Sequence, residues 1–151
     1  VRLSVPDDLV VAAVKPNYDI RTADARKVLP THVPMVDAVA NLAMMAGFVN
    51  ALAAGDWDVL GRFLGDRLAT PYRKALLPGY DAVLDAAVRA GAAGGGIAGS
   101  GSTVFALVRG QELAHEVAES MVKAFEMAGH EAMGIVSAVD PYGATVTTQR
   151  V

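Results

Sequence analysis

The stretch Gly91-Ala-Ala-Gly-Gly-Gly-Ile-Ala-Gly-Ser-Gly101, together with the apolar run Thr103–Val108 behind it, decides the fold of this chain. A run of this kind, apolar throughout, is typical of a strand buried on both faces. Before the glycines, apolar residues recur at helical spacing from Tyr80 onward, and Gly91 ends that pattern. The sequence therefore predicts a helix that leads into the glycine-rich stretch and a buried strand that leads out of it.

The glycine-rich stretch has two interpretations. Its six glycines in eleven residues permit positive φ angles and allow a ligand to approach the backbone. Gly99, Ser100 and Gly101 can direct successive N–H groups at an anion, with the Ser100 hydroxyl as a further donor. The alternative is a tight, bulged connection without a ligand. A dinucleotide fingerprint is excluded, because it follows a strand and opens a helix, whereas this stretch does the reverse.

The other elements follow from periodicity and from turn residues. Strands are predicted at Val1–Val5, Leu9–Lys15, Ala132–Val139 and Ala144–Val151. Helices are predicted at Ala23–Leu29 with Thr22 as N-cap, from Pro34 or Met35 to Ala54, at Trp57–Leu68 and at Gln111–Ala128, with irregular segments at 70–73 and 77–79. This order predicts one domain, residues 1–151, of the α+β class: a two-layer sandwich whose antiparallel sheet is covered by helices on one face.

Composition excludes several classes of function. The formal net charge is −3 and no basic stripe is present, which argues against binding of nucleic acid or an anionic membrane. The chain has no cysteine, so disulfides and thiolate chemistry are excluded, and a cytoplasmic protein is expected. The apolar run Val36–Ala54 is interrupted by Asp37, Asn41 and Asn50, so no membrane span is expected. The chain opens on a strand-like run without Met, which favours a piece of a longer protein.

Two arginines are candidates for holding a carboxylate. Arg26 lies one helical turn after Thr22, so the two side chains share a face of the predicted helix. Arg73 lies in the segment after Leu68, and an arginine fork binds a carboxylate through two parallel hydrogen bonds. The alternative is a solvated arginine paired with one of the 16 acidic residues. The histidines lack ligand spacing, so no metal site is predicted, and no general base or other catalytic residue is assigned.

Three blocks together resemble homoserine kinases, a family of the GHMP small-molecule kinase superfamily. The blocks are Thr22-Ala-Asp-Ala-Arg26-Lys-Val-Leu-Pro30, then Pro71-Tyr-Arg73-Lys-Ala-Leu-Leu-Pro78-Gly79, then the glycine-rich stretch with Ser102–Leu107. The resemblance covers essentially this whole chain but only the second half of the family's chain. It implies the ferredoxin-like C-terminal domain of these kinases, and it places the closing residues 143–146 in a last strand.

The resemblance also implies an activity and its residues. The activity is phosphorylation of the side-chain hydroxyl of L-homoserine in threonine biosynthesis, with ATP and Mg²⁺ bound mainly by a missing N-terminal domain. Arg26 and Arg73 are implied to hold the α-carboxylate, Thr22 to lie near the reacting hydroxyl and phosphate, and the Gly99–Gly101 loop to close the site. Ser102 stands where the family usually has proline, so a slightly looser loop with an added donor is expected.

The leading hypothesis is thus the substrate-binding half of a homoserine kinase, inactive or nearly so alone. Three alternatives remain. One is an independent regulatory module that binds a small amino acid, and another is a homodimerisation domain that uses the apolar Val36–Ala54 helix. The third is a fragment of another GHMP kinase of the mevalonate kinase type, which should lack the Thr22–Pro30 and Pro71–Gly79 blocks.

Overall fold

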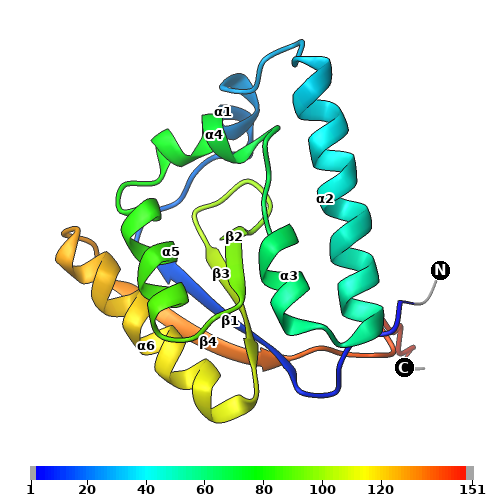
Figure 1. Ribbon diagram of the computed structural model, residues 1–151. Coiled ribbons are helices and arrows are strands. Elements are labelled where there is room, and N and C mark those ends of the chain that lie inside the picture. Colours follow the sequence, from blue (N-terminus) through cyan, green and yellow to red (C-terminus); the bar gives the residue numbers. More distant parts are fainter. Residues whose placement is uncertain (1–2, 149–151) are drawn as a thin grey trace.

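The computed structural model describes residues 3–148, and a four-stranded antiparallel sheet lies at its centre (Figure 1). The strands are β1 (Leu9–Pro16), β2 (Gly94–Ile97), β3 (Val104–Arg109) and β4 (Ala132–Ala138). Their order across the sheet is β2-β3-β1-β4, and every neighbouring pair is antiparallel. The α+β class expected from the sequence is confirmed.

One face of the sheet carries the main core. Alternate residues of β1 and β3 point to this face, and α5 (Tyr80–Arg89) and α6 (Gln111–Met127) cover it (Figure 1). Phe125 and Met121 of α6 are fully buried there. Burial of one such side chain stabilises the fold by roughly 1.5–3 kcal/mol, so this layer accounts for much of the driving force for folding.

The second face is also partly covered, which differs from the expected two-layer sandwich. Here α2 (Met35–Ala54) and α3 (Trp57–Phe63) pack on the sheet against residues of β1 and β3. Leu107 of β3 meets Leu60 of α3 in this second cluster. The strand is apolar at odd as well as even positions, so both of its faces require a partner. The half nearer β4 stays open on this side.

Two predicted element boundaries between residues 63 and 76 are wrong. Helix α3 ends at Phe63, not at residue 68, and the segment predicted as irregular forms α4 (Thr70–Arg73) followed by the 3₁₀ turn η1 (Lys74–Leu76). The Asp66 carboxylate accepts hydrogen bonds from the backbone N–H groups of Leu68, Ala69 and Thr70. The chain leaves the helical conformation at Leu64, where ψ is 81°, and the turn held by Asp66 leads into a new helix at Thr70.

The terminal strands predicted from the sequence are not formed in the described residues. Residues 3–5 lie outside any strand, and residues 1–2 lie outside the described range. Residues 144–148 likewise form no strand, which includes the closing segment 143–146, and residues 149–151 are not described. The β-branched residues of this segment have no partner strand in the described chain, and a strand requires one.

Part of the glycine-rich stretch is a strand. Gly95 of β2 pairs with Ala106 of β3, and a Cβ at residue 95 would overlap the carbonyl oxygen of Phe105 and lie 3.0 Å from the Cα of Ala106. At Gly96, the next residue, a Cβ would meet only the Phe105 ring at 3.5 Å, an ordinary contact. Gly95 is thus required by the close approach of the two backbones.

Gly95→Ala is therefore expected to lower the free energy of unfolding by about 2 kcal/mol or more, because the added methyl group must displace backbone atoms. Gly96→Ala is the matched control and should change it by less than about 1 kcal/mol. Chemical denaturation of the two variants measures this difference. Equal effects at the two positions would contradict the close approach of β2 and β3.

Candidate functional site

The Arg73 guanidinium joins three segments that are far apart in the sequence. Its Nε donates to the carbonyl oxygen of Ala25 at 3.2 Å, in the short helix α1 (Thr22–Lys27). Its Nη1 donates to the carbonyl oxygen of Gly99 at 2.8 Å, in the loop after β2. Helices α1 and α4 and the glycine loop therefore meet at one point. An arginine has five N–H donors, so three remain for a ligand.

Two hydroxyl groups lie together at this point. The Oγ1 of Thr22 and the Oγ of Ser100 are 3.3 Å apart. The expectation that Thr22 caps its helix is wrong: the N-cap is Arg21, no side chain caps the helix, and Thr22 is its first residue. Because its hydroxyl is not used by the helix, it is free to face the glycine loop.

Arg26 follows Thr22 by one turn of α1, and its side chain is exposed. It neighbours Ala25, whose carbonyl Arg73 binds, so both arginines border the same corner of the domain. Within residues 3–148, neither Arg26 nor Arg73 forms an ion pair with an acidic residue. The described residues therefore do not support the alternative, in which each arginine pairs with an acidic residue of the chain.

The glycine loop supplies fewer free N–H groups than expected. The N–H of Gly101 donates to the carbonyl oxygen of Ala98 at 3.0 Å and closes a turn. Within the described chain, the N–H groups of Gly99 and Ser100 have no backbone acceptor. Gly99 has φ +59, a conformation that favours glycine. Two N–H groups and the Ser100 hydroxyl can therefore contact an anion.

Ser102 anchors the loop and does not loosen it. Its hydroxyl donates to the carbonyl oxygen of Tyr18 at 2.6 Å, and the side chain is buried. Tyr18 also stacks edge-on against His130, with 4.9 Å between the ring centroids. The donor that the sequence adds at this position thus ties the loop to the segment after β1. The expected looser loop is wrong.

Asp66 positions the helix that carries Arg73, and the sequence analysis missed it. Partial burial raises the pKa of this carboxyl, but its bonds to the backbone N–H groups of Leu68, Thr70 and Ala69 outweigh burial and hold the pKa below its ordinary value. Asn41 of α2 accepts from the N–H of Arg67 at 2.9 Å, next to Asp66. The signal in the sequence was an Asp four residues before Thr-Pro, a spacing that suits a turn ahead of a helix.

A cleft lies on another side of α4. Its volume is about 490 Å³, and it is lined by Asp66, Thr70, Lys74, Tyr80, Asp81 and glycines of β2, among others. Lys74 pairs with Asp81 at 3.0 Å at its rim. Neither Arg26, Arg73, Thr22 nor Ser100 lines it. We place the site at the Arg73 corner, because donors without a partner in the described residues converge there.

The described residues do not suit a metal ion. They contain no group of three or more His, Cys, Asp or Glu side chains placed to hold one. The Arg73 corner offers N–H donors, which cannot ligate a cation, and two hydroxyl groups, whereas Mg²⁺ is usually bound through carboxylates. The corner is therefore built to contact anions and hydroxyl groups.

Known proteins resemble the chain in sequence and in structure. The family described as GHMP kinases C terminal matches residues 48–126. A homoserine kinase of Pyrococcus furiosus is 46% identical over 125 residues, which are 83% of this chain and 42% of that protein. The crystal structure of a homoserine kinase from Cytophaga hutchinsonii has TM-score 0.89 and 37% identity, over 92% of this chain and 44% of that one.

A more distant structure shares only the fold. The L. major mevalonate kinase in complex with R-mevalonate has TM-score 0.63 and 13% identity, over 90% of this chain and 44% of that one. The chain thus spans less than half the length of the relatives it matches.

Asp66→Asn is expected to lower the free energy of unfolding by about 1–2 kcal/mol at pH 7, because an amide accepts these N–H bonds less strongly than a carboxylate. The folded-state pKa of Asp66 is lowered. Its contribution is therefore complete above the unfolded-state pKa, about 3.9, and is lost as the pH falls through the lower folded-state pKa. Denaturation between pH 7 and pH 3 should show the wild type and Asp66→Asn converging in acid.

The control for this series is Asp85→Asn, at an exposed carboxylate of α5. It should leave stability unchanged at each pH. A difference between wild type and Asp66→Asn that stays constant down to pH 3 would mean that the Asp66 charge does not hold the turn.

Proposed function

This chain belongs to the GHMP kinase C-terminal family, and from that premise we propose that it is the substrate-binding half of a homoserine kinase. The whole protein would transfer the γ-phosphoryl group of ATP to the side-chain hydroxyl of L-homoserine, within threonine biosynthesis in the cytoplasm. The convergence of α1, Arg73 and the Gly99–Ser100 loop is the observation that carries this proposal. The homoserine kinases of P. furiosus and C. hutchinsonii, at 46% and 37% identity, are far more similar in sequence than the mevalonate kinase at 13%, which favours the amino-acid substrate.

The α-carboxylate of homoserine fits between the two arginines. Arg73 is fixed by the carbonyl groups of Ala25 and Gly99, so its remaining N–H donors have a set direction without a ligand. Arg26 is exposed and lies beside Ala25, so it can approach the carboxylate from the other side. A guanidinium fixed in advance loses little conformational entropy on binding, which strengthens the hold on the substrate.

The two hydroxyl groups suit the other end of the substrate. Thr22 lies one turn from Arg26, so a substrate held by its carboxylate at Arg26 extends toward Thr22 and Ser100. Their hydroxyl groups, with the N–H groups of Gly99 and Ser100, would contact the reacting hydroxyl and the transferred phosphoryl group. Phosphoryl transfer depends mainly on positioning and on charge stabilisation, and this chain would supply the positioning of the acceptor.

ATP and Mg²⁺ would be bound mainly by the preceding half of the protein. The described residues have no carboxylate set for Mg²⁺, and the chain spans 42% of the P. furiosus relative. When bound, Mg²⁺ neutralises charge on the phosphates, which is chemistry that the residues described here do not provide. We therefore expect the isolated chain to be inactive or nearly so.

Helix α2 offers a surface for that preceding half. The side chains of Met35, Val36 and Leu42 are 70–78% exposed, so the outer face of this apolar helix has no partner in the described chain. Figure 1 shows α2 at one side of the domain, with its upper part standing away from the sheet. By length and composition alone the helix would also suit a membrane, and 11% of it is buried. Asp37 and Asn41, however, bind the segment at Arg67 and so tie α2 to the domain.

In the whole-length protein, Arg26→Ala is expected to raise KM for L-homoserine by about 10- to 100-fold, because it removes a charge-assisted bond to the carboxylate. KM for ATP should stay within about twofold. Steady-state kinetics with each substrate varied in turn measures both. The KM for homoserine amide, which lacks the carboxylate charge, should change little on this substitution.

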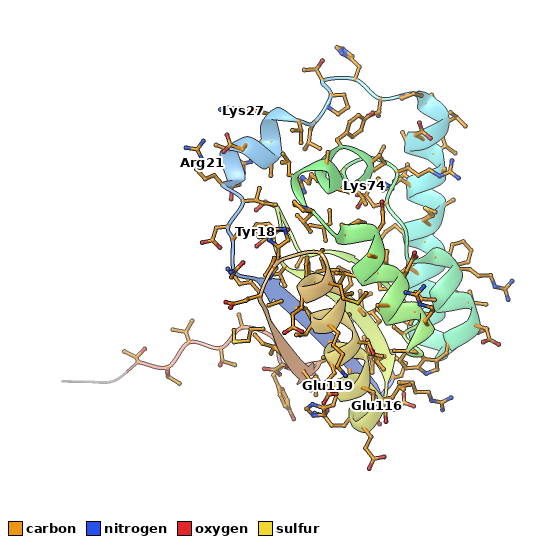
Figure 2. The ribbon with its side chains drawn as sticks, turned by 90° about the vertical axis from the view of Figure 1, so that its left-hand side faces the viewer. Tyr18, Arg21, Lys27, Lys74, Glu116 and Glu119 are labelled. Atoms are coloured by element: carbon orange, nitrogen blue, oxygen red, sulfur yellow. The ribbon has the colours of Figure 1, made fainter. Side chains whose placement is uncertain are left out.

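Arg21→Ala is the matched control for Arg26. Arg21 immediately precedes α1 and is exposed (Figure 2), but its Nε already binds Asp24 at 2.7 Å. Arg21→Ala should leave the KM values for L-homoserine and for ATP unchanged. If Arg26→Ala affected homoserine and its amide equally, or affected ATP instead, Arg26 would not hold the carboxylate.

Leu42→Glu should have different effects on the stability of the whole-length protein and of the isolated chain. Leu42 is 72% exposed in this chain, so the substitution should leave the stability of the isolated chain within about 0.5 kcal/mol. In the whole-length protein it should lower the free energy of unfolding by about 2–4 kcal/mol, because a charge enters a buried contact. Denaturation of both forms tests this. No effect in the whole-length protein would mean that α2 does not contact the preceding half.

A further inference from the structure

Ser102 has a hydroxyl group that is used inside the protein. Among residues 3–148 it is the one buried polar side chain, with 3% of its surface exposed. Its hydroxyl donates to the carbonyl oxygen of Tyr18 at 2.6 Å. Ser102 directly follows the glycine loop, residues Gly99–Gly101. A buried bond at this place does not contact a substrate, but it determines where the end of the loop lies.

The carbonyl group that accepts this bond is fixed by the turn after α6. Tyr18 lies on the segment between β1 and α1 (Figure 2), and its ring lies edge-on against His130, with 4.9 Å between the centroids. The N–H of Asn17, the preceding residue, donates to the carbonyl oxygen of Glu131 at 2.8 Å. Because α6 belongs to the main core, the turn that follows it gives the Tyr18 carbonyl a fixed position.

The glycine loop also rests directly on its neighbours. A Cβ at Gly101 would lie 2.9 Å from Leu77 and 3.2 Å from Ile20, so the loop backbone is in close contact with both side chains. Ile20 belongs to the same segment as Tyr18. Ser102 therefore holds the end of the loop against this segment, and the two apolar side chains set how near it can come. Together these contacts limit the movement of the N–H groups that are available to an anion.

We propose that Ser102 and Tyr18 are positioning residues for phosphoryl transfer. Neither contacts the substrate; the Ser102 hydroxyl, bound to the Tyr18 carbonyl, directs the N–H groups of Gly99 and Ser100 toward the transferred phosphoryl group. Donors that already point at a developing charge need no rearrangement during the reaction, and a small displacement removes much of their effect. This inference rests on the proposed function and deepens it.

A purely stabilising bond between Ser102 and Tyr18 leads to a different expectation. The substrate carboxylate is assigned to two arginines, and Arg73 keeps its bond to Ala25 when the loop shifts, so homoserine binding should largely survive. Loss of the bond should therefore lower kcat and change KM little. A bond that only stabilises the fold would instead change the midpoint of denaturation and neither kinetic constant.

Steady-state kinetics on the whole-length protein separates the two roles. Ser102→Ala should lower kcat about tenfold or more, with KM for L-homoserine within about threefold of the wild-type value. Ser102→Thr keeps a hydroxyl group and should recover most of kcat. Ser137→Ala is the matched control and should leave both constants unchanged, because Ser137 is exposed and its hydroxyl donates to the carbonyl oxygen of Ala138, away from the loop.

Tyr18 provides a second, independent arm of this experiment. Tyr18→Ala removes the ring that contacts His130, so it should lower kcat as Ser102→Ala does, whereas Tyr18→Phe keeps a ring and should recover most of kcat. In the double variant Ser102→Ala with Tyr18→Ala, kcat should fall little further than in either single variant, because both substitutions act through one bond. Circular dichroism shows which variants are folded, and the two Tyr18 variants decide if Ser102→Ala is not.

The possible failures of this inference and of the proposed function are distinguishable. An active wild type whose kcat is unchanged in folded Ser102→Ala or Tyr18→Ala would overturn the positioning role alone. Effects on kcat that multiply in the double variant would do the same, because the two residues would then act separately. A whole-length wild type that does not phosphorylate L-homoserine would overturn the proposed function, and this inference with it.

Discussion

The arrangement of the candidate site depends on one side chain, Arg73. Its bonds to the carbonyl groups of Ala25 and Gly99 hold α1 and the glycine loop against α4, although these residues are 48 and 26 positions away in the sequence. Helix α1 is only six residues long and has no side-chain cap, so local structure alone does not hold it in place. The same guanidinium thus fixes the geometry of the corner and offers further donors to a ligand.

The rest of the fold fixes Arg73 in turn. Asp66 starts α4, and Asn41 and Asp37 of α2 bind the segment next to it, so the packing of α2 reaches the site through one turn of chain. From the other side, β2 lies close against β3 and leads directly into Gly99 and Ser100. The glycines therefore serve two purposes: the close pairing of backbones within the strand, and the positive φ angle in the loop that follows it.

Much of this was predictable, for identifiable reasons. Helices α5 and α6 follow from apolar periodicity, α2 follows from a long apolar run between Pro34 and Gly55, and β1, β3 and β4 follow from short apolar runs. The start of α4 could not be predicted in this way, because it follows a turn held by bonds from the Asp66 carboxylate to the backbone, which the propensities of the neighbouring residues do not reveal. The role of Ser102 could not be predicted either, because its partner Tyr18 is 84 positions away in the sequence. Thr22 and Arg73 were named from sequence blocks, but only the folded chain shows that α1, α4 and the loop meet.

In the proposed function, Arg26 and Arg73 hold one carboxylate beside the Gly99–Ser100 loop. A crystal structure of the whole-length protein with L-homoserine bound tests it most directly. Both guanidinium groups should lie within hydrogen-bonding distance of the α-carboxylate, about 2.7–2.9 Å, with the substrate hydroxyl pointing toward Thr22 and Ser100. A homoserine molecule in the cleft at Lys74 and Asp81, or a carboxylate that contacts neither arginine, would contradict it.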